Sequence, residues 1–165
     1  MLLKSKNKQK FFVDAMLGNI AKKLRILGYD TLYSSDIADE KLIVIAKKEK
    51  RIIISRDEEL IRKSQKLGIH SIYIKTKEET DQFLEIISSE NLKIIQINGD
   101  TSRCPKCNSI IAPIDKTIIK EQIPHGVFNS INKFWRCKNC NQLYWEGTHI
   151  KNLQKFVGKI NERLS

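Results

Sequence analysis

The sequence lacks a long apolar segment, since none of its apolar runs approaches the roughly 18 residues needed to cross a membrane. The stretch MLLKSKNKQK at residues 1–10 is basic, and it lacks the apolar core and small-residue cleavage site of a secretory signal. We therefore expect a cytoplasmic protein without a membrane partner. Residues 1–10 are expected to form a basic, flexible arm.

The sequence also lacks the motifs of common small-molecule enzymes. It has no Gly-rich phosphate loop and no nucleophile motif, so a small-molecule α/β enzyme fits poorly. It shows no internal repeat and no low-complexity segment. Cysteine is absent outside residues 104–140, where all four cysteines occur. In a reducing compartment, this clustering favours metal ligation over disulfides.

What the sequence has in excess is positive charge. It contains 30 Lys and Arg against 19 Asp and Glu, which gives a formal net charge of +11. Such a surplus attracts polyanions, so nucleic acid leads the candidate partners. A basic but merely solvated surface is the alternative interpretation. The length of 165 residues suits an α/β domain with a smaller appendage.

Strand and helix patterns alternate along the first part of the chain. We expect strands over 11–14, 31–34, 51–55, 69–74 and 92–97, with helices over 17–27, 39–50, 57–68 and 78–90. Asp39 is expected to cap the second helix. This alternation predicts an α/β fold, a three-layer sandwich with a mostly parallel sheet. We place that domain at residues 11–99, and a second unit with a C-terminal helix at 100–165.

The cysteines form two C-x-x-C pairs, in RCPKCN (103–108) and RCKNCN (136–141). Such knuckles can place four thiolates tetrahedrally around one Zn²⁺. The expected ligands are Cys104, Cys107, Cys137 and Cys140. Asn108 and Asn141 suit the knuckle turns, and the long separation of the pairs requires an inserted hairpin or loop. Four thiolates leave no open position, so we expect a structural zinc; a pair of redox dithiols is the alternative.

Aspartates follow the first three expected strands. Asp14 ends the first, Asp36 and Asp39 follow the second, and Asp57 follows the third. Each alone is better explained by a helix cap or a loop acid. Together they matter more, because ligands bind beyond the carboxyl ends of parallel strands. Carboxylates gathered there repel one another unless a divalent cation is bound, and Mg²⁺ or Mn²⁺ so held serves phosphodiester cleavage.

Basic and aromatic residues supply candidate contacts to a polyanion. Four basic side chains flank the acids and are expected to attract it: Lys22, Lys23, Arg25 and Arg56. Trp135, Tyr144 and Trp145 flank the second knuckle. They either stack on bases or pack the cysteine unit against its host domain, and packing is the favoured interpretation.

One long stretch, FFVDAMLGNIAKKLRILGYDTLY, resembles the opening of the C-terminal ribonuclease domain family named after the worm mut-seven exonuclease. In that family the first strand ends in Asp, followed by Met-Leu-Gly and an L-R-x-L-G-Y-D run. Here these are Asp14, residues 16–18 and residues 24–30. The element RIIISRD, the two cysteine pairs and YWEGTH (144–149) complete a resemblance that extends from about residue 11 to 157.

The resemblance implies a PIN-like nuclease fold fused to a zinc ribbon, with RNA as substrate. It implies that Asp14 is the first acid and Asp57 the acid of the Arg-Asp element. The middle acid is Asp39 more than Asp36. A fourth acid, often found after strand four in PIN-like enzymes, has no clear match here. His149, within the EGTH stretch, is either a substrate contact near the acids or a locally bonded helix-start residue.

Two functional hypotheses follow. The leading one is a Mg²⁺- or Mn²⁺-dependent ribonuclease in which the basic surface and the zinc ribbon hold single-stranded or structured RNA. The alternative is a non-catalytic adaptor whose ribbon binds RNA or a ribosomal partner. In the adaptor the aspartates are only caps, so saturable binding of Mn²⁺ distinguishes the two hypotheses.

Overall fold

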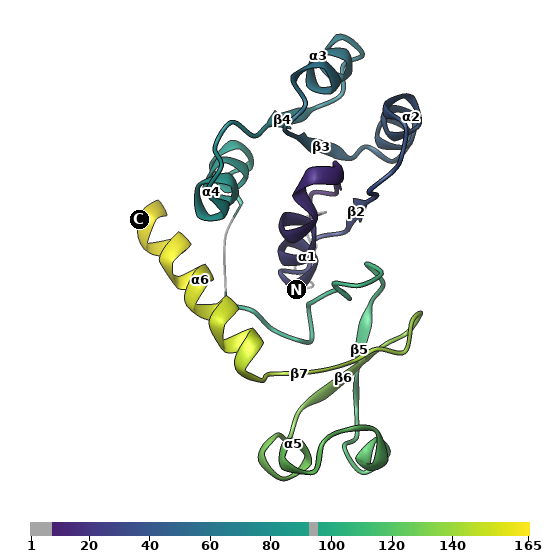
Figure 1. Ribbon diagram of the computed structural model, residues 1–165, viewed down its shortest axis with the longest axis vertical. Helices are drawn as coiled ribbons and strands as arrows, with labels where there is room; N and C mark the ends of the chain where they lie inside the picture. Colours follow the sequence, from purple (N-terminus) through teal and green to yellow (C-terminus); the bar gives the residue numbers. More distant parts are fainter. Residues whose placement is uncertain (1–7, 93–95) are drawn as a thin grey trace, which may run out of the picture.

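The computed structural model describes residues 8–92 and 96–165, which form two sheets joined by a linker (Figure 1). The first sheet is parallel, with strand order β2-β1-β3-β4. Its strands are β1 (Phe11–Val13), β2 (Thr31–Tyr33), β3 (Ile52–Ser55) and β4 (Ser71–Tyr73). The expected α/β fold is thus confirmed. The strand expected at 92–97 falls largely on residues 93–95, which lie outside the described residues.

Helices cover both faces of this sheet. The face that carries Phe11 and Val13 packs against α1 (Gly18–Ile26), which follows the short 3-10 helix η1 (Ala15–Leu17), and against α4 (Glu79–Glu90). The face that carries Phe12 and Ile53 packs against α2 (Asp39–Glu49) and α3 (Glu58–Lys66). Successive residues of a strand point to opposite faces, so short all-apolar strands bury both sides and give the expected three layers.

Strand β1 lies at the point where the strand order reverses. It pairs in parallel with β2 on one side and with β3 on the other, and Val13 is in register with both Tyr33 and Ile54. The segments that follow these strands therefore emerge at the same edge of the sheet. This is the position at which open parallel sheets bind ligands.

The second sheet is antiparallel and contains β5 (Ile111–Ile114), β6 (Phe134–Cys137) and β7 (Leu143–Trp145) in that order. The 3-10 helix η2 (Lys120–Gln122) and the short helix α5 (His125–Ser130) fill the connection from β5 to β6. This connection is the insertion expected between the cysteine pairs. The sheet and the two cysteine knuckles together are the ribbon, residues 103–145.

The C-terminal helix α6 (Thr148–Leu164) leaves the ribbon and packs on the α/β layers (Figure 1). Its buried residues Val157 and Ile160 join the apolar clusters beneath α1 and α4. Phe156 meets Phe83 of α4 edge to face, with ring centroids 5.7 Å apart. The helix thus connects the ribbon to the part of the core that lies under α1 and α4. None of the helices in the described part of the chain is long and apolar enough to span a bilayer.

Two helix starts differ in how an aspartate is used. The expectation that Asp39 caps α2 is wrong, because Ala38 is the N-cap residue and no side chain caps the helix. Asp39 is instead the first helical residue, where its charge interacts favourably with the helix dipole. Asp57 does cap α3: its side chain accepts hydrogen bonds from the backbone N–H of Glu59 and Leu60.

The ribbon docks at the amino ends of the parallel strands, opposite the edge at which Asp14 emerges (Figure 1). The backbone N–H of Arg103 donates to the carbonyl of Arg25 at 2.8 Å, and Nη1 of Arg25 donates to the carbonyl of Pro105 at 2.8 Å. Gly28 ends the helical segment with φ of +90°, and a Cβ there would lie 2.5 Å from the carbonyl oxygen of Thr101. Only glycine permits this approach of the linker.

Asn108 connects the first knuckle to the sheet. Its Oδ1 accepts from the backbone N–H of Thr31 at 2.9 Å, and its Nδ2 donates to Asp30 at 2.8 Å. Arg51, which is only 7% exposed, donates to the same Asp30 oxygen. Burial raises the pKa of Asp30, but the hydrogen bonds from Arg51 and Asn108 outweigh burial and hold the pKa below its usual value. The Arg51–Asp30 ion pair and the side-chain amide of Asn108 thus form one network between the sheet and the ribbon.

Replacing Asn108 by glycine is expected to lower the free energy of unfolding by about 2 kcal/mol, because it leaves the buried N–H of Thr31 without a partner. Glycine retains the left-handed turn that Asn108 occupies at φ 68°. Asn141→Gly is the matched control, since Asn141 has φ 61° in the second knuckle but is exposed. Urea unfolding measures both variants, and equal destabilisation would contradict the role given to the Asn108 side chain.

Candidate active site and metal centre

Asp14 and Asp57 are linked through a buried serine at the carboxyl ends of β1 and β3. Ser55 Oγ donates to Asp14 Oδ2 at 2.7 Å, and the backbone N–H of Asp57 donates to Ser55 Oγ at 2.9 Å. Ser55 is fully buried, so this arrangement is shielded from solvent on one side. The sequence interpretation missed Ser55. The available signal was a hydroxyl that closes an otherwise apolar strand, two residues before an aspartate.

Both carboxylates are fixed in direction by the backbone around them. Asp14 Oδ1 accepts from the N–H of Ala15 at 2.8 Å, and Asp57 Oδ1 accepts from the N-terminal amides of α3 at 2.9 and 3.2 Å. A carboxylate offers about four lone-pair sites, so these hydrogen bonds leave capacity for a cation. Capping a helix and facing a ligand are therefore compatible roles for Asp57.

Asp39 is the third acid at this edge. Burial raises its pKa, and the negative charges of Asp57 and Asp14 raise it further. Asp14 and Asp57 are thus close enough to Asp39 to disfavour its charged form. Asp36 is exposed and bonds to Ser34, and it is not among the charges that perturb Asp39. The structure therefore gathers Asp14, Asp39 and Asp57 and leaves Asp36 outside that group.

Within the described residues, the carboxylates of Asp14, Asp39 and Asp57 do not form a compact set of metal ligands. Within residues 8–92 and 96–165, the only side chains whose potential ligand atoms all lie within 4.8 Å of one another, in groups of three or more, are the cysteines. Mg²⁺ usually takes only one or two carboxylates and fills its remaining positions with water and substrate phosphate.

Of the residues expected to contact a polyanion, Lys23 pairs with Glu79 of α4, and the other four fall into three places. Arg25 is buried, and its guanidinium donates to the carbonyls of Thr31 and Pro105, so the structure shows it holding the ribbon rather than facing RNA. Arg56 is half-buried and adjacent to Asp57. Lys22 and His149 line one pocket beside the ribbon. His149 therefore lies with the ribbon-side end of α1, whereas Asp14 precedes that helix at its other end.

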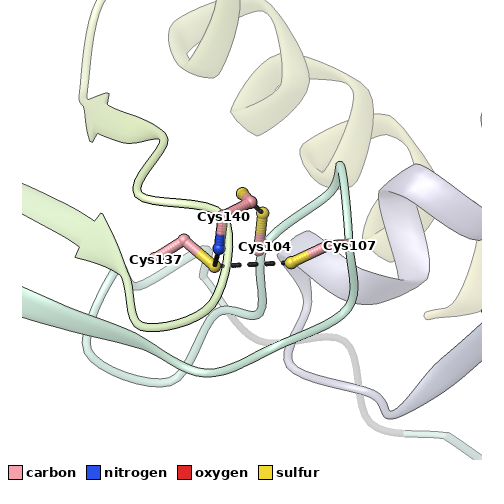
Figure 2. A group of neighbouring side chains, drawn as sticks. All are labelled: Cys104, Cys107, Cys137 and Cys140. Carbon is pink, nitrogen blue, oxygen red and sulfur yellow. Dashed lines mark hydrogen bonds between the residues drawn. The ribbon is translucent and has the colours of Figure 1, made fainter.

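The four cysteines converge between two loops of the ribbon (Figure 2). The Sγ atoms of Cys104 and Cys140 are 3.6 Å apart, and those of Cys107 and Cys137 are 3.4 Å apart. A tetrahedral site with Zn–S bonds of about 2.3 Å requires sulfur–sulfur separations of about 3.8 Å. The residues present therefore fit a four-thiolate metal centre, as the C-x-x-C spacing predicted.

The two knuckles have the same backbone design. The N–H of Asn108 donates to the carbonyl of Cys104, and the N–H of Asn141 donates to that of Cys137. Both asparagines have positive φ, as the turn prediction requires. The amide of each leading cysteine also bonds to a carbonyl five residues ahead, which closes each loop on itself.

The thiols have unequal acidities. Burial raises the pKa of Cys104 to about 12. Burial also raises that of Cys107, but hydrogen bonds from the Ser109 backbone and from Cys137 outweigh it and lower the pKa to about 6. The hydroxyl of Tyr144 lies 2.9 Å from Cys104 Sγ, within hydrogen-bonding distance, and burial raises the pKa of Tyr144. Tyr144 thus supports a ligand from the outer shell.

Trp135 packs the ribbon against the linker. It is 4% exposed, and its Nε1 donates to Asp100 at 2.9 Å. Its ring lies on Gly99, where a Cβ would come within 2.4 Å of the indole. The packing interpretation is thus confirmed for Trp135. Trp145 is half-buried and packs against Phe134.

The comparisons with known proteins identify the family to which the chain is related. A family model described as Mut7-C RNAse domain matches residues 9–157, nearly the whole chain. No curated protein and no solved structure matches the chain significantly.

Proposed function

Because the chain belongs to the Mut7-C RNAse domain family, a family of ribonuclease-type hydrolases, we propose that it hydrolyses RNA phosphodiester bonds at the carboxylate edge in a reaction that depends on Mg²⁺ or Mn²⁺. The observation that carries the proposal is the Asp14–Ser55–Asp57 arrangement at the point where the strand order reverses. Asp39 completes the proposed set of ligands. The domain is proposed to be PIN-like, and its place of action the cytoplasm.

In this proposal the protein holds the three carboxylates in place and supplies a positive charge for the substrate. Ser55 holds Asp14, the first turn of α3 holds Asp57, and Asp39 begins α2, so each carboxylate is oriented by a different element. When bound, the divalent ion would lower the pKa of an attacking water and neutralise charge that develops on the phosphate. Arg56, next to Asp57, is proposed to meet a phosphate of the substrate.

The cysteine ribbon is proposed to hold a structural Zn²⁺. Its four thiolates leave no ligand position for substrate, so the zinc would stabilise a unit with a small core of its own. The ribbon sits at the opposite edge of the sheet from the acids. RNA that touches both must therefore run alongside α1.

The test is cleavage of labelled single-stranded and structured RNA by the purified chain, with Mn²⁺ or Mg²⁺ added or omitted. Cleavage is expected only with the added ion. Strong chelators are unsuitable here, because they would also remove metal from the cysteines. RNA binding without cleavage under all ion conditions, together with no saturable binding of Mn²⁺, would overturn the proposal and favour the adaptor.

A further inference from the structure

A pocket of about 350 Å³ lies between α1 and the ribbon, away from the carboxylate edge. Its size falls within the range of about 300–1,000 Å³ typical of small-molecule sites. Apolar side chains from three parts of the chain form it: Ile26 from α1, Ile97 from the linker, Ile111 and Trp135 from the ribbon, and Trp145 and Ile150 around the start of α6. The pocket thus exists only because the ribbon docks on the α/β layers.

Cationic side chains accompany this apolar lining. Lys22 and Lys106 are exposed, and Arg103 is half-buried, with its Nη1 donating to the carbonyl of Asn108; all three line the pocket. His149 adds a further donor, and Glu146 is the one acid among the described residues that line it. An apolar interior with a positively charged lining suits a ligand in which a flat, weakly polar group is attached to a negatively charged chain.

Trp145 is the half-buried aromatic residue of this lining. Its ring packs against Phe134, with ring centroids 6.1 Å apart, beside the apolar cluster of Ile119 and Ile123, and Trp145 also lines the pocket. Base–aromatic stacking occurs with every base and needs little sequence preference. By contrast, Trp135 and Tyr144 are already occupied by Asp100 and Cys104.

From these features we propose that the pocket receives one unstacked base of a single-stranded RNA segment, with the neighbouring phosphates on Lys22, Arg103 and Lys106. The choice of RNA rests on the proposed function, whereas the requirement for an unpaired base rests on the pocket. A base inside a duplex cannot enter without being unstacked, so paired RNA is disfavoured.

The outer face of α1 connects this pocket to the acids. Met16, Asn19 and Lys22 are all exposed and follow one another at three-residue intervals. At a rise of 1.5 Å per residue, the eight residues from Asp14 to Lys22 span about 12 Å. The held base would therefore lie a few nucleotides from the bond that is cut.

The test measures binding of short labelled RNA to full-length, zinc-loaded Asp14→Asn protein without Mg²⁺ or Mn²⁺, so that cleavage plays no part. A series of oligomers of equal length and charge carries one abasic nucleotide at each position in turn. One position is expected to lower the affinity about ten-fold, the effect of losing one base–aromatic stack. Equal affinity across the series, or no binding of the intact oligomer, would overturn the proposal whether or not the wild-type protein cleaves RNA.

Variants then locate the effect. Trp145→Leu keeps apolar volume but removes the aromatic face, and it is expected to abolish the difference between intact and abasic RNA. Ile150→Trp, which fills the pocket from α6, is expected to do the same if Trp145→Leu fails to fold. Lys22→Glu is expected to weaken the binding of all oligomers several-fold. Lys66→Glu, at the C-terminal end of α3, makes the same charge change away from the pocket and is the control. Base dependence that persists in folded Trp145→Leu and Ile150→Trp would overturn the proposal.

Discussion

Replacing Asp14 by asparagine is expected to reduce RNA cleavage more than about 100-fold. Loss of an outer-shell partner alone costs up to about 100-fold at metal sites, and loss of a direct carboxylate ligand costs more. The variant should fold, because the amide oxygen of asparagine can still accept from Ala15, and Ser55 can still accept from Asp57. The cleavage rate in Mn²⁺ and the unfolding temperature together measure the two expectations.

Asp36→Asn is the matched control for this experiment. It makes the same chemical change at an exposed acid that lies outside the carboxylate group, and its cleavage rate should stay within about two-fold of wild type, as for a surface change away from the site. Full activity in Asp14→Asn would show that cleavage, if observed, takes place elsewhere. Equal loss in both variants would mean that the middle acid is Asp36 rather than Asp39.

Replacing Cys137 by serine is expected to cause loss of the metal and unfolding of the ribbon, whereas the parallel sheet should stay folded. Metal binding contributes about 10–16 kcal/mol of folding free energy in structural zinc peptides, and the ribbon's own apolar residues form two small clusters, one around Cys104 and Trp135 and one around Ile119 and Phe134. Metal analysis should find one zinc per chain in the wild type and none in Cys137→Ser. Hydrogen exchange should show protection lost in β5, β6 and β7 but kept in β1 and β3.

Tyr144→Phe is the appropriate comparison. It keeps all four thiolates and removes only the hydroxyl on Cys104, so it should retain zinc with an affinity about 10- to 100-fold lower. Intact protection of the ribbon in metal-free Cys137→Ser would contradict a structural role for the metal. It would show that packing alone maintains the antiparallel sheet.

Local patterns predicted most of the fold. Short apolar runs such as those at β1 and β3 favour buried strands because of their length and their β-branched or aromatic residues, and the helical spacing between them predicts covering helices. The convergence of Asp14 and Asp57 followed from parallel topology, because β1 and β3 are neighbours. The cysteine centre followed from spacing, since two C-x-x-C loops have few other uses.

Other features depend on contacts that no local pattern encodes. The cap of α2 could not be read correctly, because the turn leading from β2 places Ala38 rather than Asp39 at the N-cap position. Arg25 was expected to meet RNA because charge is normally solvated, yet the carbonyls of Thr31 and Pro105 surround its guanidinium. The edge at which the ribbon docks is set by Asn108, some 80 residues from its partners in sequence, and long-range pairing of this kind needs the structure.

The double role of Asn108 couples two equilibria. The same residue completes the turn after the first cysteine pair and bridges the ribbon to Thr31 and Asp30, so assembling the knuckle and attaching it to the sheet favour one another. Thermodynamic linkage then requires that docking raises metal affinity by the same factor by which metal favours docking. A peptide of the ribbon alone would consequently bind zinc more weakly than the intact chain does, and the ratio of the two dissociation constants would measure how strongly the two units hold together.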